Sequence, residues 1–411
     1  MDGQSMKRIG ILGGGQLGRM TIEESRKLLS YIEVLSPDYP SPAADLADAT
    51  HLGDLMDYEA VMEVAREVDV LSYEIEHVNV DALWELERGG MPVIPAAAVL
   101  ALIQDKGRQK ELMDANGIPT AAWAWVDGGQ SPATPDGLHQ AALSLGGYPV
   151  VQKARRGGYD GRGVAVIRNE ADARSAGDGG RLLAVPSFVE RKVAFDKELA
   201  VVVARDQAGR EASYPCVEMV FDERANLCDS VLMPARVPPE TLARAGAVAR
   251  SVVDALDSAA KAEAAAEAHP STGAAGVFGV ELFLTADGSI LVNEAAPRPH
   301  NSGHVSMEAC VTSQFEQYYR ILAGYPLGST ALIMPGMMVN LLGEPGATGE
   351  PDYLGLADAL SVPGVSVHLY GKREVRPFRK MGHLTAIAPS AEEAMERAER
   401  ARKALRIMGR A

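Results

Sequence analysis

The sequence is poor in cysteine and has no long apolar runs. Its three cysteines, Cys216, Cys228 and Cys310, are an odd number without CxxC spacing, so neither a disulfide framework nor a zinc site is indicated. No apolar run is long enough to span a bilayer. The N-terminal segment leads straight into a strand-like run and lacks the basic-then-apolar pattern of a signal peptide. We therefore expect a cytoplasmic protein that has no membrane partner.

Basic charge is also scarce, because the formal net charge of the 411 residues is −15. A protein that wraps nucleic acid needs a basic face, so nucleic acid is not an expected partner. The apolar fraction of 47% and the charged fraction of 23% are those of an ordinary globular protein, long enough for two or three domains. Small anionic substrates would have to be bound by local clusters of Arg and Lys.

Short apolar runs alternate with helical patterns over the first hundred residues. The pattern predicts strands over residues 8–12, 31–35 and 68–72, and a helix that follows the first strand and ends at about Leu29. Strand, turn, helix and strand in this order predict a parallel, doubly wound sheet of the α/β class.

From about Asp105 the pattern changes, and an α+β region built on antiparallel sheets is predicted. A helix over 105–116 precedes predicted strands over 148–153, 163–168, 187–190 and 198–204. Residues 254–276 have the pattern of a surface helix and loop without chemistry.

A small β-rich C-terminal domain is predicted beyond about Gly328. Its predicted elements are strands over 336–342 and 365–370 and a final helix over 391–408. The expected domains are 1–104, 105–327 and 328–411.

A glycine-rich turn, Gly13-Gly14-Gly15-Gln16-Leu17-Gly18, joins the first strand to its helix. Backbone N–H groups at the start of a helix suit a phosphate or another anion. Dinucleotide binding would require an acid at the end of the second strand, where Leu35-Ser36-Pro37 stands instead. A tight turn that allows close helix packing explains the glycines equally well, so both interpretations stay open.

A second glycine-rich segment, Lys153 to Gly163, carries four glycines and three arginines between two predicted strands. Glycines let backbone amides close over phosphate oxygens, and the cations offset the charge of the phosphate. The spacing is not that of a P-loop, which would need Gly-Lys-Ser/Thr at the start of a helix. The alternative is a mobile hairpin loop with solvated charges, but Tyr159 and Asp160 would then lack a structural purpose.

Two apolar strands over 277–285 and 290–294 are joined through Asp287-Gly288, a preferred type I′ turn. If these residues are the turn centre, Ala286 pairs with Ser289, and Glu281 lies opposite Glu294. Facing carboxylates repel each other unless a cation lies between them. Oxygen ligands of this kind suit Mg²⁺ held jointly with nucleotide phosphates, whereas the alternative is an edge hairpin whose glutamates point to water.

The segment Ala296 to His304 reads Ala-Pro-Arg-Pro-His-Asn-Ser-Gly-His and follows the hairpin at once. His300 and His304 are four residues apart, but Pro299 and Gly303 argue against the helix that would bring both to zinc. An extended loop with Arg, His and Asn beside a magnesium site favours an oxyanion pocket, because all three side chains can donate hydrogen bonds. A basic cluster, residues 372–380, is either a further anion site or a solvated loop.

Short motifs follow one another along nearly the whole chain. They are GGGQLGRM near the start, SYEIEHV (72–78), DKGRQKELM (105–113), GGYDGRG (157–163), NEAAPRPHNSGH (293–304), TSQFEQ (312–317) and RKMGH (379–383). Together they resemble the ATP-grasp ligases, and among these the N5-carboxyaminoimidazole ribonucleotide synthetase family. GGYDGRG and PRPHNSGH in one chain are highly specific. Phe378 is a departure, since glycine is common at that position of the family.

The resemblance implies a central ATP-grasp domain and a ligase that uses ATP and Mg²⁺. ATP would phosphorylate bicarbonate to carboxyphosphate, and the amine of aminoimidazole ribonucleotide would attack the activated carbon dioxide. The products would be the carbamate, ADP and phosphate. The family also suggests a homodimer.

Carried over by motif, the resemblance implies a role for each of the following residues. ATP phosphates would contact Lys106 and Lys153, under a closing loop of Gly158, Tyr159, Asp160, Gly161, Arg162 and Gly163. The adenine hinge would be Glu190, Arg191, Lys192 and Val193, with Glu198 on the ribose and Glu218 as a weaker nucleotide candidate. Magnesium would be bound by Glu281, Glu294 and Asn293, of which the last two also belong to the ATP site.

The substrate positions follow in the same way. Bicarbonate or carboxyphosphate would be held by Arg298, His300 and Asn301. Aminoimidazole ribonucleotide would be lined by Gln16, Leu17 and Glu74, reached by Tyr159 and Arg162, and held on its phosphate side by Lys372 and Arg379. Asp160, with Lys372 nearby, would manage the proton that leaves the attacking amine.

Three other interpretations were compared with this one. A sister ATP-grasp enzyme that uses formate with glycinamide ribonucleotide, or biotin, would carry other residues in place of PRPHNSGH and RPFRKMGH. An NAD-dependent oxidoreductase would not need the Glu281/Glu294 hairpin. A catalytically dead nucleotide-binding regulator would have no use for both acids together with Lys153, Asp160 and Lys372.

Overall fold

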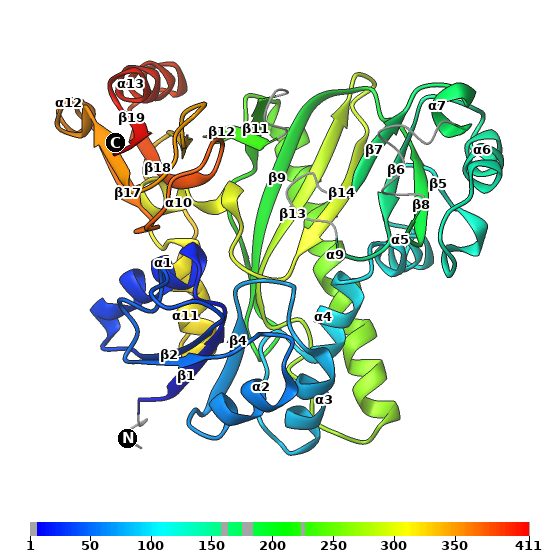
Figure 1. Ribbon diagram of the computed structural model, residues 1–411, viewed down its shortest axis with the longest axis horizontal. Helices are drawn as coiled ribbons and strands as arrows, with labels where there is room; N and C mark the ends of the chain where they lie inside the picture. Colours follow the sequence, from blue (N-terminus) through cyan, green and yellow to red (C-terminus); the bar gives the residue numbers. More distant parts are fainter. Residues whose placement is uncertain (1–5, 158–162, 175–183, 223–226, 411) are drawn as a thin grey trace.

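The computed structural model describes residues 6–157, 163–174, 184–222 and 227–410. Figure 1 shows an N-terminal part at the lower left, a central part that extends to the right, and a C-terminal part at the upper left. The predicted combination of α/β and α+β architecture is confirmed. Across the described residues, no helix is both long enough and apolar enough to cross a membrane.

The N-terminal part is built on a parallel sheet, as predicted, with the strand order β3-β2-β1-β4. Nearly every residue of β1, β2 and β4 is buried, as expected for a parallel sheet covered on both faces. The strands are β1 (Arg8–Leu12), β2 (Tyr31–Ser36), β3 (Ala49–Leu52) and β4 (Val70–Tyr73), and the helices are α1 (Gln16–Ser25), α2 (Tyr58–Ala65) and α3 (Val80–Arg88). The first helix ends earlier than predicted, and a short 3₁₀ turn, Arg26–Leu28, replaces its last turn.

The central part contains a small antiparallel sheet with the order β5-β8-β6-β7. Its strands are β5 (Trp123–Trp125), β6 (Val150–Ala154), β7 (Val164–Ile167) and β8 (Ser187–Arg191). The helices that precede or cover it are α4 (Ala97–Ile103), α5 (Lys106–Ala115), α6 (Pro135–Ser144) and α7 (Glu170–Arg174).

A large antiparallel sheet forms the centre of the molecule, with the order β14-β13-β9-β11-β12-β15-β18-β17. The strands that the central part contributes are β9 (Phe195–Arg205), β11 (Val217–Asp222), β12 (Leu227–Met233), β13 (Gly276–Thr285) and β14 (Ile290–Ala296), and the short β10 (Glu211–Ser213) pairs with β9 outside this order. One face packs on the long helix α9 (Pro239–Ala266) through an apolar cluster. A surface helix and loop were predicted over 254–276. The helix begins earlier, at Pro239, and ends at Ala266 before the loop, and the buried Val252, Val253 and Leu256 show that one side of it belongs to the core.

The large sheet continues without a break into the C-terminal part, because β12 pairs with β15 (Gly336–Leu342). The remaining strands are β16 (Pro351–Leu354), β17 (Val365–Leu369), β18 (Lys380–Ile387) and β19 (Arg406–Gly409), and the helices are α12 (Leu356–Leu360) and α13 (Ala391–Ala404). The final helix was predicted to reach residue 408, but it stops at Ala404. Leu405 and Ile407 are buried in alternation, which suits the strand that pairs with β16.

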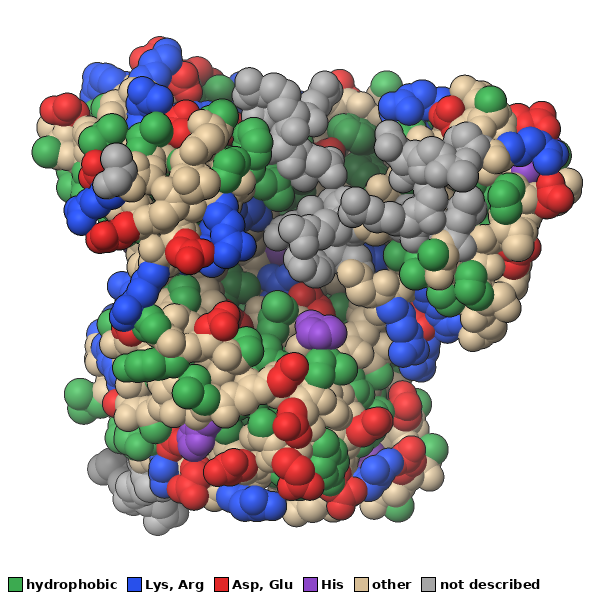
Figure 2. All heavy atoms as spheres, viewed as in Figure 1, with side chains coloured by type: hydrophobic (Ala, Val, Ile, Leu, Met, Phe, Trp, Pro, Cys, Tyr) green, Lys and Arg blue, Asp and Glu red, His purple; other side chains and the backbone are tan. Residues whose placement is uncertain are grey.

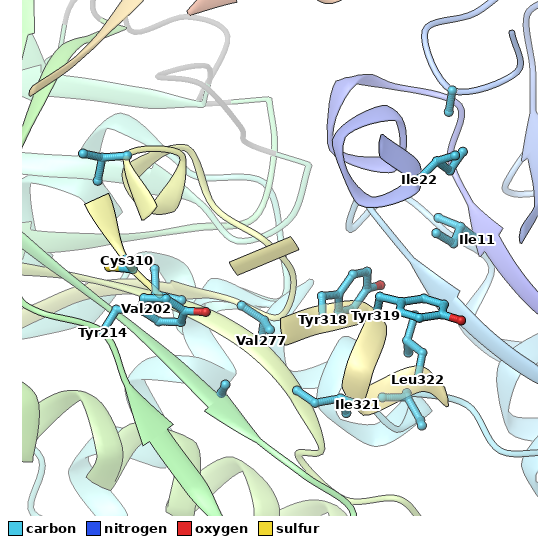
Figure 3. Close-up of a cluster of buried hydrophobic side chains, with 14 of the residues drawn as sticks. Ile11, Ile22, Val202, Tyr214, Val277, Cys310, Tyr318, Tyr319, Ile321 and Leu322 are labelled. Carbon is cyan, nitrogen blue, oxygen red and sulfur yellow. The ribbon is translucent and has the colours of Figure 1, made fainter. Parts of the chain in front are cut away.

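Helix α11 (Gln314–Ala323) joins the N-terminal part to the large sheet. Ser313 caps the helix by accepting a hydrogen bond from the Glu316 N–H, and Gly324 ends it in the left-handed conformation. Figure 3 shows Tyr318 and Leu322 of this helix in one apolar cluster with residues of the N-terminal part and of the large sheet. The Tyr318 hydroxyl donates to the Tyr73 carbonyl at 3.0 Å. This helix is thus fixed on several sides.

Candidate active site

The predicted pairing of Glu281 with Glu294 is confirmed by the register of β13 and β14. The predicted turn is wrong by one residue, because the Thr285 N–H donates to the Ser289 carbonyl and Gly288 has a φ of 81°. This geometry is a three-residue loop with a left-handed glycine rather than a type I′ turn. A bulge follows, because Leu282 pairs with Val292 and Asn293 of β14 is left as the extra residue. This bulge offsets the longer loop and returns Glu281 to its place opposite Glu294.

The two carboxylates are bound by cations and donors of the protein. Lys106, the first residue of α5, forms an ion pair with Glu294. Asn293 donates to Glu281 at 3.1 Å and accepts from the Lys153 ammonium at 2.9 Å. Although burial alone would raise it, the pKa of Glu294 lies well below its ordinary value because of Lys106 and Lys153. Glu294 is therefore ionised and held at the start of α5.

Glu190 at the end of β8 brings the small sheet to the same place. Its carboxylate lies between Lys110 and Lys153, the latter at 2.8 Å. Burial would raise the pKa of Glu190, but the two ammonium groups lower it. Sequence reasoning missed Lys110, whose signal was its position one helical turn after Lys106 in DKGRQK. A small cavity between the two sheets is lined by Lys106, Gln109, Lys110, Lys153, Phe188, Asn293 and Glu294.

The base of the glycine loop is anchored to α5. Asp105 caps that helix and is fully buried, and both of its carboxylate oxygens accept from the Arg155 Nε–H, at 2.9 and 2.8 Å. Arg156 also reaches Asp105, at 3.2 Å. Across the base of the loop the Ala154 N–H donates to the Gly163 carbonyl. The predicted residues Gly158, Tyr159, Asp160, Gly161 and Arg162 lie outside the described residues.

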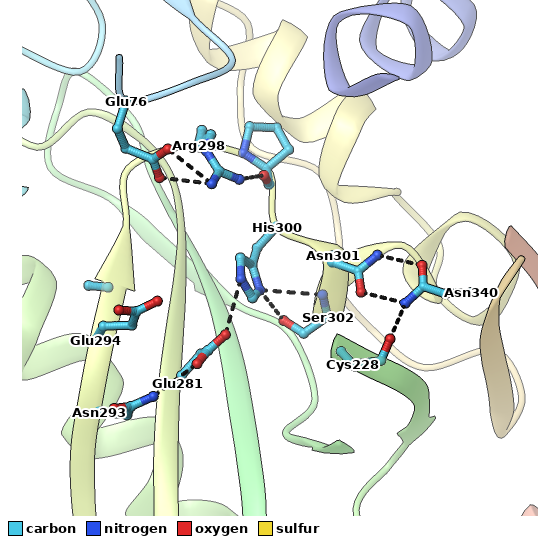
Figure 4. Close-up of polar contacts among 12 residues, drawn as sticks. Glu76, Cys228, Glu281, Asn293, Glu294, Arg298, His300, Asn301, Ser302 and Asn340 are labelled. Atoms are coloured by element: carbon cyan, nitrogen blue, oxygen red, sulfur yellow. Dashed lines mark hydrogen bonds and ion pairs between the residues drawn. The ribbon is translucent and has the colours of Figure 1, made fainter. Parts of the chain in front are cut away.

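Figure 4 shows His300 between Arg298 and the two carboxylates of Glu281 and Glu294. The Arg298 guanidinium contacts both oxygens of Glu76, at 2.8 and 3.1 Å. The Nδ1 atom of His300 accepts from the Ser302 N–H at 3.3 Å, which leaves the proton of a neutral ring on Nε2. That Nε2 faces Glu281 at 3.3 Å. The structure therefore brings His300 to the predicted metal ligand Glu281, whereas Arg298 contacts Glu76, a partner that sequence reasoning missed.

Asn301 is turned away from this pair. Its side-chain amide exchanges two hydrogen bonds with that of Asn340 on β15, at 3.0 and 2.9 Å. Asn340 in turn donates to the Cys228 carbonyl at 2.8 Å. Figure 4 shows the Asn301 amide directed at Asn340 rather than at Arg298. Asn301 thus ties the loop to the large sheet, and the structure does not place it with the other predicted oxyanion donors.

The glycine turn of the N-terminal part binds a carboxylate of the protein itself. Glu74, which follows β4, accepts hydrogen bonds from the N–H groups of Gly15 and Gly18 at the start of α1. A Cβ at Gly13 or Gly15 would collide with the Glu74 side chain. Burial raises the pKa of Glu74, and the two N–H donors oppose this effect. A dinucleotide phosphate would have to displace this carboxylate, so the turn is not a dinucleotide site in this structure.

Gln16 and Lys372 connect the N-terminal part to the C-terminal part. The Lys372 ammonium donates to Gln16 Oε1 at 2.8 Å and to the Lys380 carbonyl at 2.6 Å. Leu17 packs on an apolar cluster that contains Tyr370. Figure 2 shows the surface hollowed where the N-terminal, central and C-terminal parts meet, with charged side chains at the margin of the hollow.

Arg379 and Phe378 lie in the loop that precedes β18. The Arg379 guanidinium donates to the Glu374 carbonyl at 2.7 Å. Phe378 has a φ of 61°, in the left-handed region that favours glycine. The glycine that is common at this position of the family suits this conformation, and Phe378 adopts it at a cost of about 1–2 kcal/mol. The loop therefore holds a bulky residue in a backbone conformation that suits glycine.

The remaining predicted nucleotide residues divide between the two faces of the large sheet. Glu198 pairs with Phe283 and lies on the same face as Glu281. Glu218 pairs with Leu199 and therefore lies on the opposite face, where Lys197 and Arg236 contact it. The structure does not bring Glu218 to the acidic pair. Arg191 and Lys192 are exposed at the end of β8, and Val193 follows them.

The acids fit a magnesium ion that arrives with a nucleotide. Among the residues that the structure describes, no three His, Cys, Asp or Glu side chains come together to hold a metal ion. Magnesium is usually bound through one or two carboxylates together with substrate phosphates, and Glu281 with Glu294 supplies two. The zinc alternative fails, because His304 is buried against Gln314 and His383 while His300 faces Glu281.

The raised pKa of Glu198 predicts that the stability of the protein depends on pH. Burial and the nearby Glu281 raise its pKa from 4.5 to about 7. An acid whose pKa is raised on folding stabilises the protein fully below its unfolded pKa, and this contribution is lost as the pH rises through 7. Glu198→Gln is therefore expected to be more stable than the wild type by roughly 1–2 kcal/mol at about pH 8, after a discount for partial exposure. The difference should be much smaller at about pH 5, and it should vanish only below the unfolded pKa of 4.5.

Thermal unfolding of both proteins at the two pH values checks this expectation. The exposed Glu59 provides a matched control, and Glu59→Gln should show no such difference. A stability gain of Glu198→Gln that is the same at both pH values would contradict the raised pKa.

Three parts of the chain match known domain families. Residues 6–104 match the ribonucleotide synthetase preATP-grasp domain, residues 111–315 match the ATP-grasp domain, and residues 336–397 match the phosphoribosylaminoimidazole carboxylase C-terminal domain. The three matches together span most of the chain, in the order expected from the motifs.

Individual relatives agree along nearly the full length. The N5-carboxyaminoimidazole ribonucleotide synthase of Synechococcus elongatus is 38% identical over 406 residues, which are 97% of this chain and 94% of the relative. The crystal structure of N5-carboxyaminoimidazole ribonucleotide synthetase from Thermotoga maritima is 41% identical with a TM-score of 0.83, and covers 98% of this chain and 100% of that chain. The N5-carboxyaminoimidazole synthase of Aspergillus clavatus in complex with ADP and 5-aminoimidazole ribonucleotide is 33% identical with a TM-score of 0.83, over 98% and 99%. On this identity and coverage, the chain belongs to the N5-carboxyaminoimidazole ribonucleotide synthetase family of ATP-grasp enzymes.

Proposed function

We propose that this protein carboxylates 5-aminoimidazole ribonucleotide with bicarbonate in an ATP-dependent reaction of purine biosynthesis. ATP phosphorylates bicarbonate to carboxyphosphate, and the 5-amino group attacks the activated carbon dioxide. The amine loses a proton, and the products are N5-carboxyaminoimidazole ribonucleotide, ADP and phosphate. Family membership supports the reaction, and the arrangement of charged side chains supports the assignment of its residues.

The observation that carries the proposal is that three of the proposed ligand-binding side chains hold an internal partner of complementary chemistry. Lys106 is paired with Glu294, Arg298 with Glu76, and His300 with Glu281. A nucleotide, a divalent cation and a small oxyanion supply these same charges from outside. Binding can thus exchange protein partners for ligand partners without leaving a charge buried and uncompensated, which would otherwise be costly.

Lys106 and Lys153 are assigned to the nucleotide phosphates. Both ammonium groups line the cavity between the two sheets. Glu190 and the residues after it, up to Val193, are assigned to the adenine, and Glu198 is assigned to the ribose. Gly158 to Gly163 are assigned to the covering loop, since their motif lies between β6 and β7 in the sequence.

Glu281, Glu294 and Asn293 would hold the magnesium ion. When bound, magnesium offsets the charge of the transferred phosphoryl group and of the phosphates left behind. Release of Glu281 from His300 frees the Nε2–H of His300 as a donor to the oxyanion. Arg298 supplies the second donor, and Asn301 fixes the loop that carries both.

The amine substrate is assigned to the junction of the N-terminal and C-terminal parts. Gln16, Leu17 and Glu74 come from the first part, and Lys372 and Arg379 come from the last. Tyr159 and Arg162 are proposed to reach it from the covering loop. Asp160 is the proposed base for the amine proton, with Lys372 nearby. The cytoplasmic location and the homodimer expected from the sequence stay predictions.

Release of ADP with each substrate omitted in turn tests this function. ADP release should require bicarbonate, and incorporation of labelled bicarbonate should require aminoimidazole ribonucleotide as well. Formate with glycinamide ribonucleotide, or biotin, should not replace these substrates, and reduced nicotinamide should not bind. Absence of label from the product under every condition would overturn the proposed carboxylation.

A further inference from the structure

Gln314 is the first residue of α11 and belongs to the TSQFEQ motif, to which no function was assigned. Its side chain is fully buried. Its Oε1 accepts from the His300 N–H at 3.0 Å, and its Nε2 donates to the His300 carbonyl at 2.7 Å. His300 has extended backbone angles, so both of its backbone groups can meet one amide side by side. Gln314 thus pairs with His300 as a neighbouring strand would.

The loop around His300 is shaped to this amide. A Cβ at Gly303 would collide with the Gln314 amide, so the loop passes closer than any other residue type would allow. The His300 N–H can only donate and its carbonyl can only accept, which fixes the orientation of the Gln314 amide. The Gln314 Nε2 atom also lies 3.1 Å from Nδ1 of His304, so its second hydrogen is donated to a neutral His304 ring.

We propose that Gln314 is a positioning residue that fixes the His300 backbone and thereby aims the imidazole at the oxyanion. Helix α11 gives Gln314 a rigid base, because Ser313 caps it and Tyr318 binds the N-terminal part. With the backbone of His300 fixed, only two side-chain torsions remain, and the contact of Nδ1 with Ser302 at 2.8 Å restricts them. The proposal rests on the assignment of His300 to the oxyanion site under the proposed function.

The same helix offers a matched control. Gln317, one turn further along α11, is also fully buried. It donates to the Gly328 carbonyl at 3.0 Å and accepts from the Gly328 N–H at 2.7 Å. This is the same two-point contact with a loop backbone, made to a segment that carries none of the residues assigned to the reaction.

Gln314→Leu is expected to lower kcat/KM for bicarbonate by about 10- to 100-fold, because a small displacement of a reacting group carries such a cost. The affinity for ADP, measured by calorimetry, should be unchanged. Gln317→Leu should lose comparable thermal stability and keep kcat/KM for bicarbonate. Gln314→Glu retains the acceptor for the His300 N–H and should fall between the wild type and Gln314→Leu; it also serves if the leucine variant does not fold.

His300→Ala tests the oxyanion site separately from the positioning role of Gln314. If it leaves bicarbonate saturation normal, the oxyanion site and the positioning role both fail. If it impairs saturation while Gln314→Leu behaves like Gln317→Leu, the site stands and the positioning role is overturned.

Discussion

Glu281→Gln and Glu294→Gln are each expected to lose magnesium-dependent turnover by about a hundredfold or more, because each variant removes one of two facing carboxylates at the proposed metal site. The pair lies on one face of the large sheet, in register, with Lys106 and His300 as its present partners. Turnover should be measured as ADP release over a range of magnesium concentrations.

The two variants should differ in stability. Glu281→Gln removes a like charge from beside Glu294 and should cost little. Glu294→Gln leaves the Lys106 ammonium without its ion-pair partner, which should cost about 1–3 kcal/mol for a partly exposed pair. Asp287→Asn at the exposed end of the same hairpin is the control and should keep both activity and magnesium dependence. Wild-type ADP release in either glutamine variant would rule out the proposed metal site.

Arg298→Ala and Lys372→Met are expected to separate the two half-reactions. Arg298→Ala should lose bicarbonate-dependent ADP release and carboxylation together, since removal of one oxyanion donor typically costs about a hundredfold or more. Lys372→Met should lose carboxylation but retain some bicarbonate-dependent ADP release, because activation of bicarbonate does not need the amine. Asp160→Asn should resemble Lys372→Met.

The geometry supports this separation. Arg298 lies above the acidic pair and contacts Glu76, whereas Lys372 lies at the junction with Gln16. ADP release and labelled bicarbonate should be followed with and without aminoimidazole ribonucleotide. Normal carboxylation by Arg298→Ala would remove Arg298 from the bicarbonate site, and equal loss of both activities in Lys372→Met would contradict the division of roles.

The sequence predicted contacts well where the chain geometry is local. A short turn limits a hairpin to a few registers, and Glu281 was placed opposite Glu294 although the predicted turn was wrong by one residue. The pairing nevertheless survived two irregularities that offset each other, a left-handed Gly288 and a bulge at Asn293. Sequence patterns do not specify such bulges, since the extra residue is chosen by packing on the neighbouring strand.

Contacts between distant segments could not be predicted in this way. Glu76 meets Arg298 across 222 positions of the chain, and no local pattern indicates that pairing. Asn301 was expected beside Arg298, but Asn340 on β15 holds its amide. The glycine turn after β1 suggested an external anion. Glu74, which follows the neighbouring strand β4, supplies that anion instead. In each case the tertiary fold selects among partners that the sequence leaves equally open.

The pairing of β12 with β15 affects how this chain could be divided or exchanged. The family match for the C-terminal part begins at residue 336, so that segment resembles a detachable module. A chain ended before β15 would expose the unpaired N–H and C=O groups of β12 along an open edge, which promotes aggregation. The C-terminal segment is therefore part of the folding unit of the central sheet, and a chimera between relatives would have to exchange the matching surface of β12 with it.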